Sequence, residues 1–178
     1  APLTAGSLRA DGGGGGGDAL FVRTADSGET VLLSADSIAV SGQTTIAYFG
    51  FEDLSLDTVD GDDLLTVSGT HAGRTTLVTG SGADTLTILA TAGLLNAETG
   101  AEADTLNVRS IAVAAEVDLG AGADTVHVAS DAPDNLGTLQ GIGAELTLLG
   151  GGDDGDSLNV SNFGDTADRA GSLSQSVV

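Results

Sequence analysis

Six aspartates recur in one local pattern, in which apolar residues follow the acid two and four positions later. The segments that share the pattern are GGGGDALFV (14–22), VDGDDLLTV (59–67), GSGADTLTI (80–88), GAEADTLNV (100–108), GAGADTVHV (120–128) and GDDGDSLNV (152–160). The aligned acids are Asp18, Asp63, Asp84, Asp104, Asp124 and Asp156. Carboxylates repeated beside glycine-rich turns suit the ligation of a hard divalent cation, because calcium prefers carboxylate and carbonyl oxygens.

The spacing of these acids predicts a repeat of about 20 residues. Asp84 lies 21 residues after Asp63, and Asp104 and Asp124 follow at intervals of 20 residues. Asp156 comes 32 residues after Asp124, which indicates an insertion of about twelve residues around 131–143. Self-similarity at a fixed short period is typical of solenoid proteins, in which each repeat is one structural unit.

Stacked repeats would place Asp84, Asp104 and Asp124 in one column, about 4.8 Å apart. Two carboxylates at that distance repel by roughly 1 kcal/mol in water and by several kcal/mol at an effective dielectric of 20. The chain has five arginines and no lysine with which to compensate 26 acids, so a bound divalent cation is expected. The alternative is that each aspartate caps its own turn through a hydrogen bond to the backbone.

Two short strands per repeat are expected to position these acids. After each aspartate the chain alternates, with Leu86 and Ile88 directed inward and Thr85 and Thr87 outward. A second strand precedes the next turn, at 75–79, 95–99 and 115–119. No segment has a helical stripe of apolar residues bounded by helix caps, so almost no helix is expected. The predicted fold is all-β, a parallel β-solenoid with coils of about 20 residues.

The runs GSGADTLT and GAGADTVH resemble the haemolysin-type (RTX) calcium-binding repeat GGxGxDxUx, and GGGGGDALF (13–21) matches all its fixed positions. The resemblance implies calcium between adjacent coils. The residues that it implicates are Gly14, Gly16 and Asp18, Gly80, Gly82 and Asp84, and Gly120, Gly122 and Asp124.

The chain departs from that family, whose coils have 18 residues and two such turns, and Glu102 replaces the second glycine of one repeat. It is more similar to the strand-rich repeats of giant bacterial surface proteins, with calcium along one edge. Further acids expected near that edge are Asp60, Asp62, Glu102, Asp118, Asp153 and Asp154.

The composition limits the classes of partner. A net charge of −21 argues against nucleic acid and against anionic membranes, although a merely solvated acidic surface would carry the same charge. There is no cysteine, so neither disulfides nor thiolate sites exist. No run of 18 apolar residues predicts a membrane span.

The whole chain, 1–178, is expected to form a single stack. Segment 7–22 resembles segment 145–160 at an offset of 138 residues, so both ends are expected in equivalent phases of a larger unit. Neither end carries an obvious polar cap, and uncapped strand edges invite further pairing. The expected partners are therefore copies of the chain stacked end to end, or neighbouring repeats of a longer parent protein.

These features predict an extracellular, calcium-stabilised structural protein, part of an adhesin, a surface layer or a filament, and not an enzyme. His71 and His127 are the only histidines, and neither lies in a catalytic motif. One alternative is a β-helix that binds carbohydrates or surfaces, including surface glycans, through outward threonines and asparagines. A polysaccharide-cleaving β-helix enzyme is the third alternative.

Overall fold

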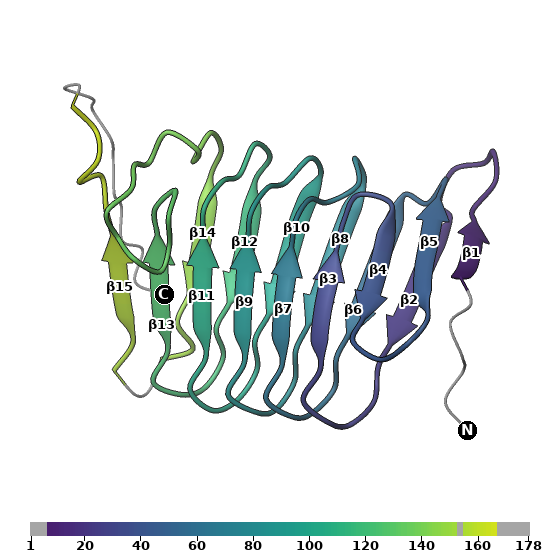
Figure 1. Cartoon of the computed structure of the whole chain (residues 1–178), viewed down its shortest axis with the longest axis horizontal. Coiled ribbons are helices and arrows are strands. Elements are labelled where there is room, and N and C mark those ends of the chain that lie inside the picture. The colour runs from purple at the N-terminus through teal and green to yellow at the C-terminus, as the bar shows by residue number, and fades with distance from the viewer. Residues whose placement is uncertain (1–6, 153–154, 167–178) are drawn as a thin grey trace.

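The computed structural model describes residues 7–152 and 155–166, and the strands in this part form two sheets (Figure 1). Sheet A has nine strands in the order β1-β5-β4-β3-β7-β9-β11-β13-β15, and sheet B has six in the order β14-β12-β10-β8-β6-β2. No helix occurs among the described residues, and none there is long and apolar enough to cross a membrane. The expected all-β class with parallel strands is confirmed at this level.

The strands have four or five residues each and recur with the repeat. Sheet A contains β1 (Ser7–Asp11), β3 (Thr30–Leu33), β4 (Ser37–Val40), β5 (Thr45–Phe49), β7 (Leu64–Val67), β9 (Thr85–Ile88), β11 (Thr105–Val108), β13 (Thr125–Val128) and β15 (Ser157–Val160). Sheet B contains β2 (Ala19–Arg23), β6 (Asp53–Asp57), β8 (Arg74–Val78), β10 (Leu94–Glu98), β12 (Ala115–Asp118) and β14 (Leu146–Leu149). From β6 to β15 the chain alternates between the two sheets.

The register of sheet A confirms the predicted period. Leu64 pairs with Thr85, Thr85 with Thr105, Thr105 with Thr125, and Thr125 with Ser157, all in parallel strands. The insertion lies between β13 and β14, as predicted, and the pairing resumes after it without a shift of phase. The turns that lead into β7, β9 and β11 lie along the lower edge of Figure 1.

Small aliphatic side chains fill the space between the sheets. The inward residues of β9, Leu86 and Ile88, are fully buried, and so is Leu77 of the opposite sheet. The core contains residues of both sheets from Val31 to Val128. The predicted alternation of inward and outward residues is confirmed from β6 to β10 and in β12 and β13, where every second side chain is buried.

The expectation of purely parallel pairing is wrong near the N-terminus. Strand β4 pairs antiparallel with both β3 and β5, and β1 then adds in parallel to β5. The links 34–36 and 41–44 are too short for a parallel crossover, which needs a dozen residues or more, so these strands fold back on one another. The turn 41–44 contains Gly42 in the left-handed region, a hairpin signal that the repeat obscured.

The expected structural equivalence of segments 7–22 and 145–160 is also wrong. In the first segment the chain passes from sheet A (β1) to sheet B (β2), whereas in the second it passes from sheet B (β14) to sheet A (β15). Their likeness reflects two strands joined by a glycine-rich turn, not the same phase of a larger unit.

Candidate functional site

Four of the predicted acids form a column at the turns that lead into sheet A. Asp63, Asp84, Asp104 and Asp124 immediately precede β7, β9, β11 and β13, and their exposed fractions are 3%, 1%, 1% and 1%. Asp156 continues the column before β15 but is exposed. The repeat therefore brings these five side chains together, in a buried position that the sequence did not predict.

Hydrogen bonds join each acid to the next. The N–H of Asp63 donates to Oδ1 of Asp84 (2.7 Å), that of Asp84 to Asp104 (2.8 Å), and that of Asp104 to Asp124 (2.8 Å). The N–H of Asp124 donates in turn to Oδ1 of Asp156 (3.0 Å). Each acid thus satisfies a backbone donor of the preceding repeat through its Oδ1, which accepts in either charge state of the carboxyl.

A second bond runs in the opposite direction at every step. The N–H of the residue after each acid donates to the carbonyl of the preceding acid, as Thr105 does to Asp84 (2.8 Å) and Ser157 does to Asp124 (2.8 Å). An acid and the residue after it therefore hold the preceding acid by two bonds. The alternative interpretation, in which aspartate satisfies backbone N–H groups, describes this geometry, although the bonded N–H belongs to the neighbouring repeat.

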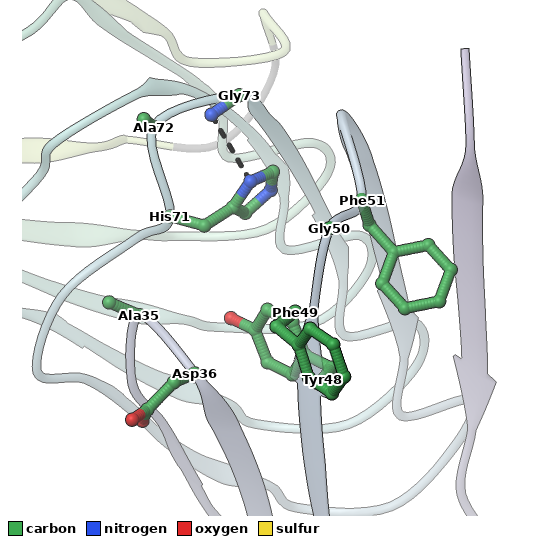
Figure 2. A pocket seen from close by; sticks show the side chains of 9 residues that line it. All are labelled: Ala35, Asp36, Tyr48, Phe49, Gly50, Phe51, His71, Ala72 and Gly73. Carbon is green, nitrogen blue, oxygen red and sulfur yellow. Dashed lines mark hydrogen bonds between the residues drawn. The ribbon is translucent and has the colours of Figure 1, made fainter. Parts of the chain in front are cut away.

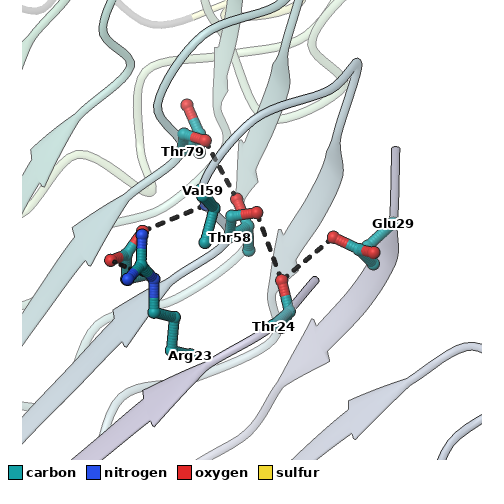
Figure 3. Close-up of polar contacts among 7 residues, drawn as sticks. Arg23, Thr24, Glu29, Thr58, Val59 and Thr79 are labelled. Carbon is teal, nitrogen blue, oxygen red and sulfur yellow. Dashed lines mark hydrogen bonds and ion pairs between the residues drawn. The ribbon is translucent and has the colours of Figure 1, made fainter. Parts of the chain in front are cut away.

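Glu29 is the first member of the column, and the sequence pattern did not predict it. Its N–H donates to Oδ1 of Asp63 (2.6 Å), and its own carboxylate accepts the hydroxyls of Ser27 (2.7 Å) and Thr24 (2.9 Å), the latter drawn in Figure 3. Segment 24–29, TADSGE, aligns with TGSGAD at 79–84, but glutamate in place of aspartate hid the match. The term acid ladder below denotes Glu29, Asp63, Asp84, Asp104, Asp124 and Asp156.

Asp18 does not belong to the acid ladder, which corrects the predicted alignment. It precedes β2 of sheet B, and its N–H donates to Oε2 of Glu52 (2.9 Å) at the corresponding corner of the next repeat. The glycines before it, including Gly14 and Gly16, are exposed. The match of 13–21 to the haemolysin-type pattern therefore falls at a different corner from the other repeats.

A threonine ladder runs beside the acid ladder (Figure 3). The hydroxyl of Thr58 donates to the carbonyl of Thr79 (3.3 Å) and that of Thr79 to the carbonyl of Thr99 (2.8 Å), while the Thr24 hydroxyl, bonded to Glu29, also lies 3.2 Å from the carbonyl oxygen of Thr58. The hydroxyl of Thr99 donates to Leu119 (2.9 Å), where the ladder ends. Threonine five residues before the aspartate in three repeats was the available sequence signal.

The glycines of the turns allow neighbouring turns to approach closely. A side chain at Gly80, Gly100 or Gly120 would collide with the backbone carbonyl of the preceding turn. The second glycines, Gly82 and Gly122, have φ values of 133° and 148°, which favour glycine. Of the predicted glycines, Gly80, Gly82, Gly120 and Gly122 are thus required by the packing of the turns, whereas Gly14 and Gly16 are not.

Glu102 occupies the same position as Gly82 and Gly122 in its own turn. Its φ is 77°, in a region that residues with a side chain seldom adopt. Its Oε2 accepts the N–H of Gly82 (3.0 Å), which offsets part of that cost.

Burial raises the pKa of the four inner acids. The pKa of Asp104 rises to about 6, chiefly through desolvation, while the hydrogen bond from Asp84 and the nearby Thr99 lower it and the charges of Asp84 and Asp124 add to it. The pKa values of Asp63, Asp84 and Asp124 shift in the same direction, with burial as the leading cause. In each of the four carboxyls Oδ2 is buried and has no hydrogen-bond partner, so it needs either a proton or a cation.

The buried column fits a proton better than calcium. Calcium takes six to eight oxygens, whereas the described residues contain no group of three or more acids and histidines placed to hold one ion. A neutral carboxyl needs only one acceptor for its Oδ2 proton. Thr79 and Thr99 lie beside Asp84 and Asp104 and lower the pKa of each, so they oppose protonation, but desolvation by burial has the larger effect and raises both pKa values.

Two further predicted acids, Asp62 and Asp118, lie at the outer side of the turns. Asp62 accepts the N–H of Ala83 (2.9 Å) and is exposed, and Asp118 accepts the N–H of Gly120 (3.1 Å). Asp154 lies outside the described residues, and so does Asp153. Each of these two bonds uses only Oδ1 of the aspartate, so the N–H does not engage Oδ2. The side chain of Asp62 is exposed to solvent.

One cavity of about 300 Å³ lies where the β4–β5 hairpin meets the loop after β7 (Figure 2). Tyr48, Phe49 and Phe51 line it, three of the five aromatic residues in the chain. His71 stands edge-on to Tyr48, with ring centroids 6.1 Å apart, and Asp36 lies on the opposite wall. Both ring nitrogens of His71 are engaged by backbone groups of Gly73 and Arg74.

Comparison of the chain with protein-family models, with curated proteins and with solved structures finds no match. A function must therefore be inferred from the geometry of the two ladders, the turns and the aromatic cavity.

Proposed function

We propose that the chain is a β-solenoid segment of an extracellular structural or adhesive protein. The observation that carries the proposal is the constant register, in which successive parallel strands of both sheets pair without slippage. Such an arrangement makes a rod whose length grows with the number of repeats, because each repeat contacts its neighbours alone.

The distribution of polar groups supports a structural role over catalysis. The buried acids of the ladder accept backbone N–H groups of the preceding repeat, and the buried threonines beside them donate to backbone carbonyls of the next repeat. A catalytic site needs a singular constellation with a free acid or base. His71, the histidine of the cavity, has both nitrogens bonded to backbone, and the ring of His127 contacts Asn135.

A deletion tests the solenoid directly. Removal of residues 85–104 takes out one repeat and joins Asp84 to Thr105, which keeps the phase of both sheets. We expect a folded protein with cooperative unfolding, whose longest dimension in X-ray scattering is shorter by roughly 4.8 Å. Removal of residues 85–94 is the matched control. It deletes one strand of sheet A, so every later strand would have to pair in the wrong sheet, and this variant should not fold. Loss of folding in both deletions would contradict the proposal.

Calcium remains part of the proposal as a hydrated counterion at the exposed side of the turns, since the described residues contain no group of three acids and histidines to enclose an ion there or in the buried column. Bound at that exposed side, the ion would screen the repulsion of Asp62 with Asp63 and Asp84 and that of Asp118 with Glu98, its partner in the adjacent strand. We expect millimolar calcium to raise the melting temperature and chelation to lower it, because the ion binds the folded chain. The response should shrink in the variant Asp62→Asn and persist in Asp134→Asn, an exposed acid of the insertion. An equal response in both variants would exclude calcium binding beside Asp62 at the exposed side of the turns.

The aromatic cavity favours carbohydrate binding as a second candidate function. Aromatic side chains with a carboxylate at the rim suit a sugar ring, whose apolar face stacks and whose hydroxyls accept and donate hydrogen bonds. A glycan array with the whole chain tests this, with Phe49→Ala as the cavity variant and Phe163→Ala as an exposed aromatic control. Glycan binding that survives Phe49→Ala would show that the aromatic cavity is not the binding site.

A further inference from the structure

The acid ladder has a direction. Every backbone N–H in it donates toward the C-terminal end of the stack, from Glu29 to Asp63 and finally from Asp124 to Asp156. Each carboxylate therefore serves the repeat before it. The two ends of the ladder consequently differ. The N-terminal end presents the carboxylate of Glu29, and the C-terminal end presents the backbone N–H and carbonyl of Asp156.

The N-terminal end of the ladder is closed. The carboxylate of Glu29 accepts hydroxyls from Ser27 and Thr24 within its own turn, so it does not serve a preceding repeat. Beyond β3, sheet A continues through the antiparallel strands β4 and β5 and then β1, which have no counterparts in the repeat. This end thus departs from the repeat in both its turn and its sheet.

The C-terminal end continues the repeat, and no described strand lies over its last coil. Leu158 and Val160 of β15 occupy the inward positions of Val126 and Val128, yet their exposed fractions are 47% and 45% against 2% and 5%. Strands β15 and β14 are the last of their sheets and pair on one side only in the described part of the chain. Figure 1 shows β15 projecting beyond β14 at this end.

We propose that this C-terminal end docks a further polypeptide segment of the same repeat type, one that carries an acid followed by an alternating apolar strand. Its carboxylate accepts the N–H of Asp156, and the next residue donates its N–H to the Asp156 carbonyl, as in the preceding steps. Its strand pairs in parallel with β15 and covers Leu158 and Val160. This inference rests on the proposed structural role and adds the direction and the chemistry of assembly.

The N-terminal end of a second copy does not meet these requirements. Its Glu29 carboxylate is already bonded, and an Asp18 turn leads into sheet B rather than sheet A. Sheet A has nine strands and sheet B six, so copies joined through β15 and β1 would leave three strand positions of sheet B unfilled. The partner is therefore a repeat segment and not the opposite end of an identical molecule.

A labelled peptide tests the proposal. The probe is the sequence of residues 99–118, TGAEADTLNVRSIAVAAEVD, which contains one acid of the ladder, Asp104, and both strands of a repeat. We expect saturable binding to the whole chain by fluorescence anisotropy, about tenfold weaker when Asp104 of the probe is replaced by alanine and retained with asparagine. The protein variant Leu158→Lys should lose binding, whereas Leu8→Lys, at the exposed N-terminal edge, should keep it.

Amide exchange locates the contact independently of these variants. Binding at the proposed end slows exchange at the Asp156 N–H and along β15, and leaves β1 unchanged. Protection at β1, loss of binding in Leu8→Lys alone, or binding indifferent to the probe's acid would overturn the proposal. A chain that still tolerates deletion of one repeat but binds no probe would refute this inference while leaving the structural role intact.

Discussion

The backbone N–H of Asp84 lies 2.8 Å from Oδ1 of Asp104, a residue one repeat further along the chain. The bond leaves Oδ2 of Asp104 buried without a partner. Two substitutions separate the roles of these oxygens, because asparagine keeps the acceptor for Asp84 and removes the charge, whereas alanine removes both.

At pH 7.5 we expect Asp104→Asn to be at least as stable as the parent chain. Asp104→Ala should lose about 1–3 kcal/mol, the cost of leaving the Asp84 N–H unsatisfied in the interior. Urea denaturation followed by circular dichroism measures both. Equal losses for the two variants would mean that the ladder needs the ionised carboxylate, as a cation site would.

Stability should fall as the pH rises from about 4 to about 7. Burial raises the pKa of Asp104 to about 6 from its ordinary 3.8, so the folded chain holds more protons than the unfolded chain between these values. The proton-linked stability is complete below the unfolded pKa and is lost as the pH passes through the folded pKa. Melting temperatures across this range test the sign, with Asp104→Asn expected to flatten the profile. A profile that rises with pH would contradict neutral acids in the column.

Gly100→Ala should destabilise the chain by several kcal/mol, on the order of a backbone clash combined with left-handed strain. Its φ is 98°, and an added side chain would meet the carbonyl of Gly80. Gly14→Ala is the control, since no atom lies within 4 Å of a side chain placed there. Thermal unfolding distinguishes the two, and a mild effect at Gly100 would show that the turns can separate.

Thr99→Val should cost about 1–2 kcal/mol, because the buried carbonyl of Leu119 loses its hydroxyl donor. Thr85→Val provides the comparison on the outer face of β9, where the side chain is half-buried and a β-branched replacement suits the strand. We expect that variant to stay within about 0.5 kcal/mol of the parent chain in the same denaturation experiment. Equal losses of unfolding free energy at the two positions would show that the threonine ladder does not stabilise the fold.

The sequence predicted the period, the inward rows and the insertion because a strand's alternation and a solenoid's repeat are both local patterns. Leu86 and Ile88 could be assigned to the core from their spacing alone. The antiparallel strands β4 and β5 could not, since their alternation equals that of a parallel strand and only the short links distinguish them.

Predicting the site was harder, because its bonds join residues in different repeats. The column of Asp84, Asp104 and Asp124 was predicted, but a pattern of acids does not reveal whether their oxygens face ions or backbone N–H groups. The aspartate pattern does not predict Glu29, because glutamate stands at that position, and it includes Asp18, because the flanking glycines match the motif. Burial, which decides the charge state, arises from the packing of neighbouring turns.

The loop between β13 and β14 shows how tolerant one corner of the fold is. Ala115 pairs with Leu146 and Thr125 with Ser157, so the strands on either side keep their partners despite the longer path between them. The number of residues at this corner can therefore differ between repeats while the register of the strands along the rod stays the same. A lineage, or an engineer, can vary the loop as a display site while the scaffold beneath it stays constant.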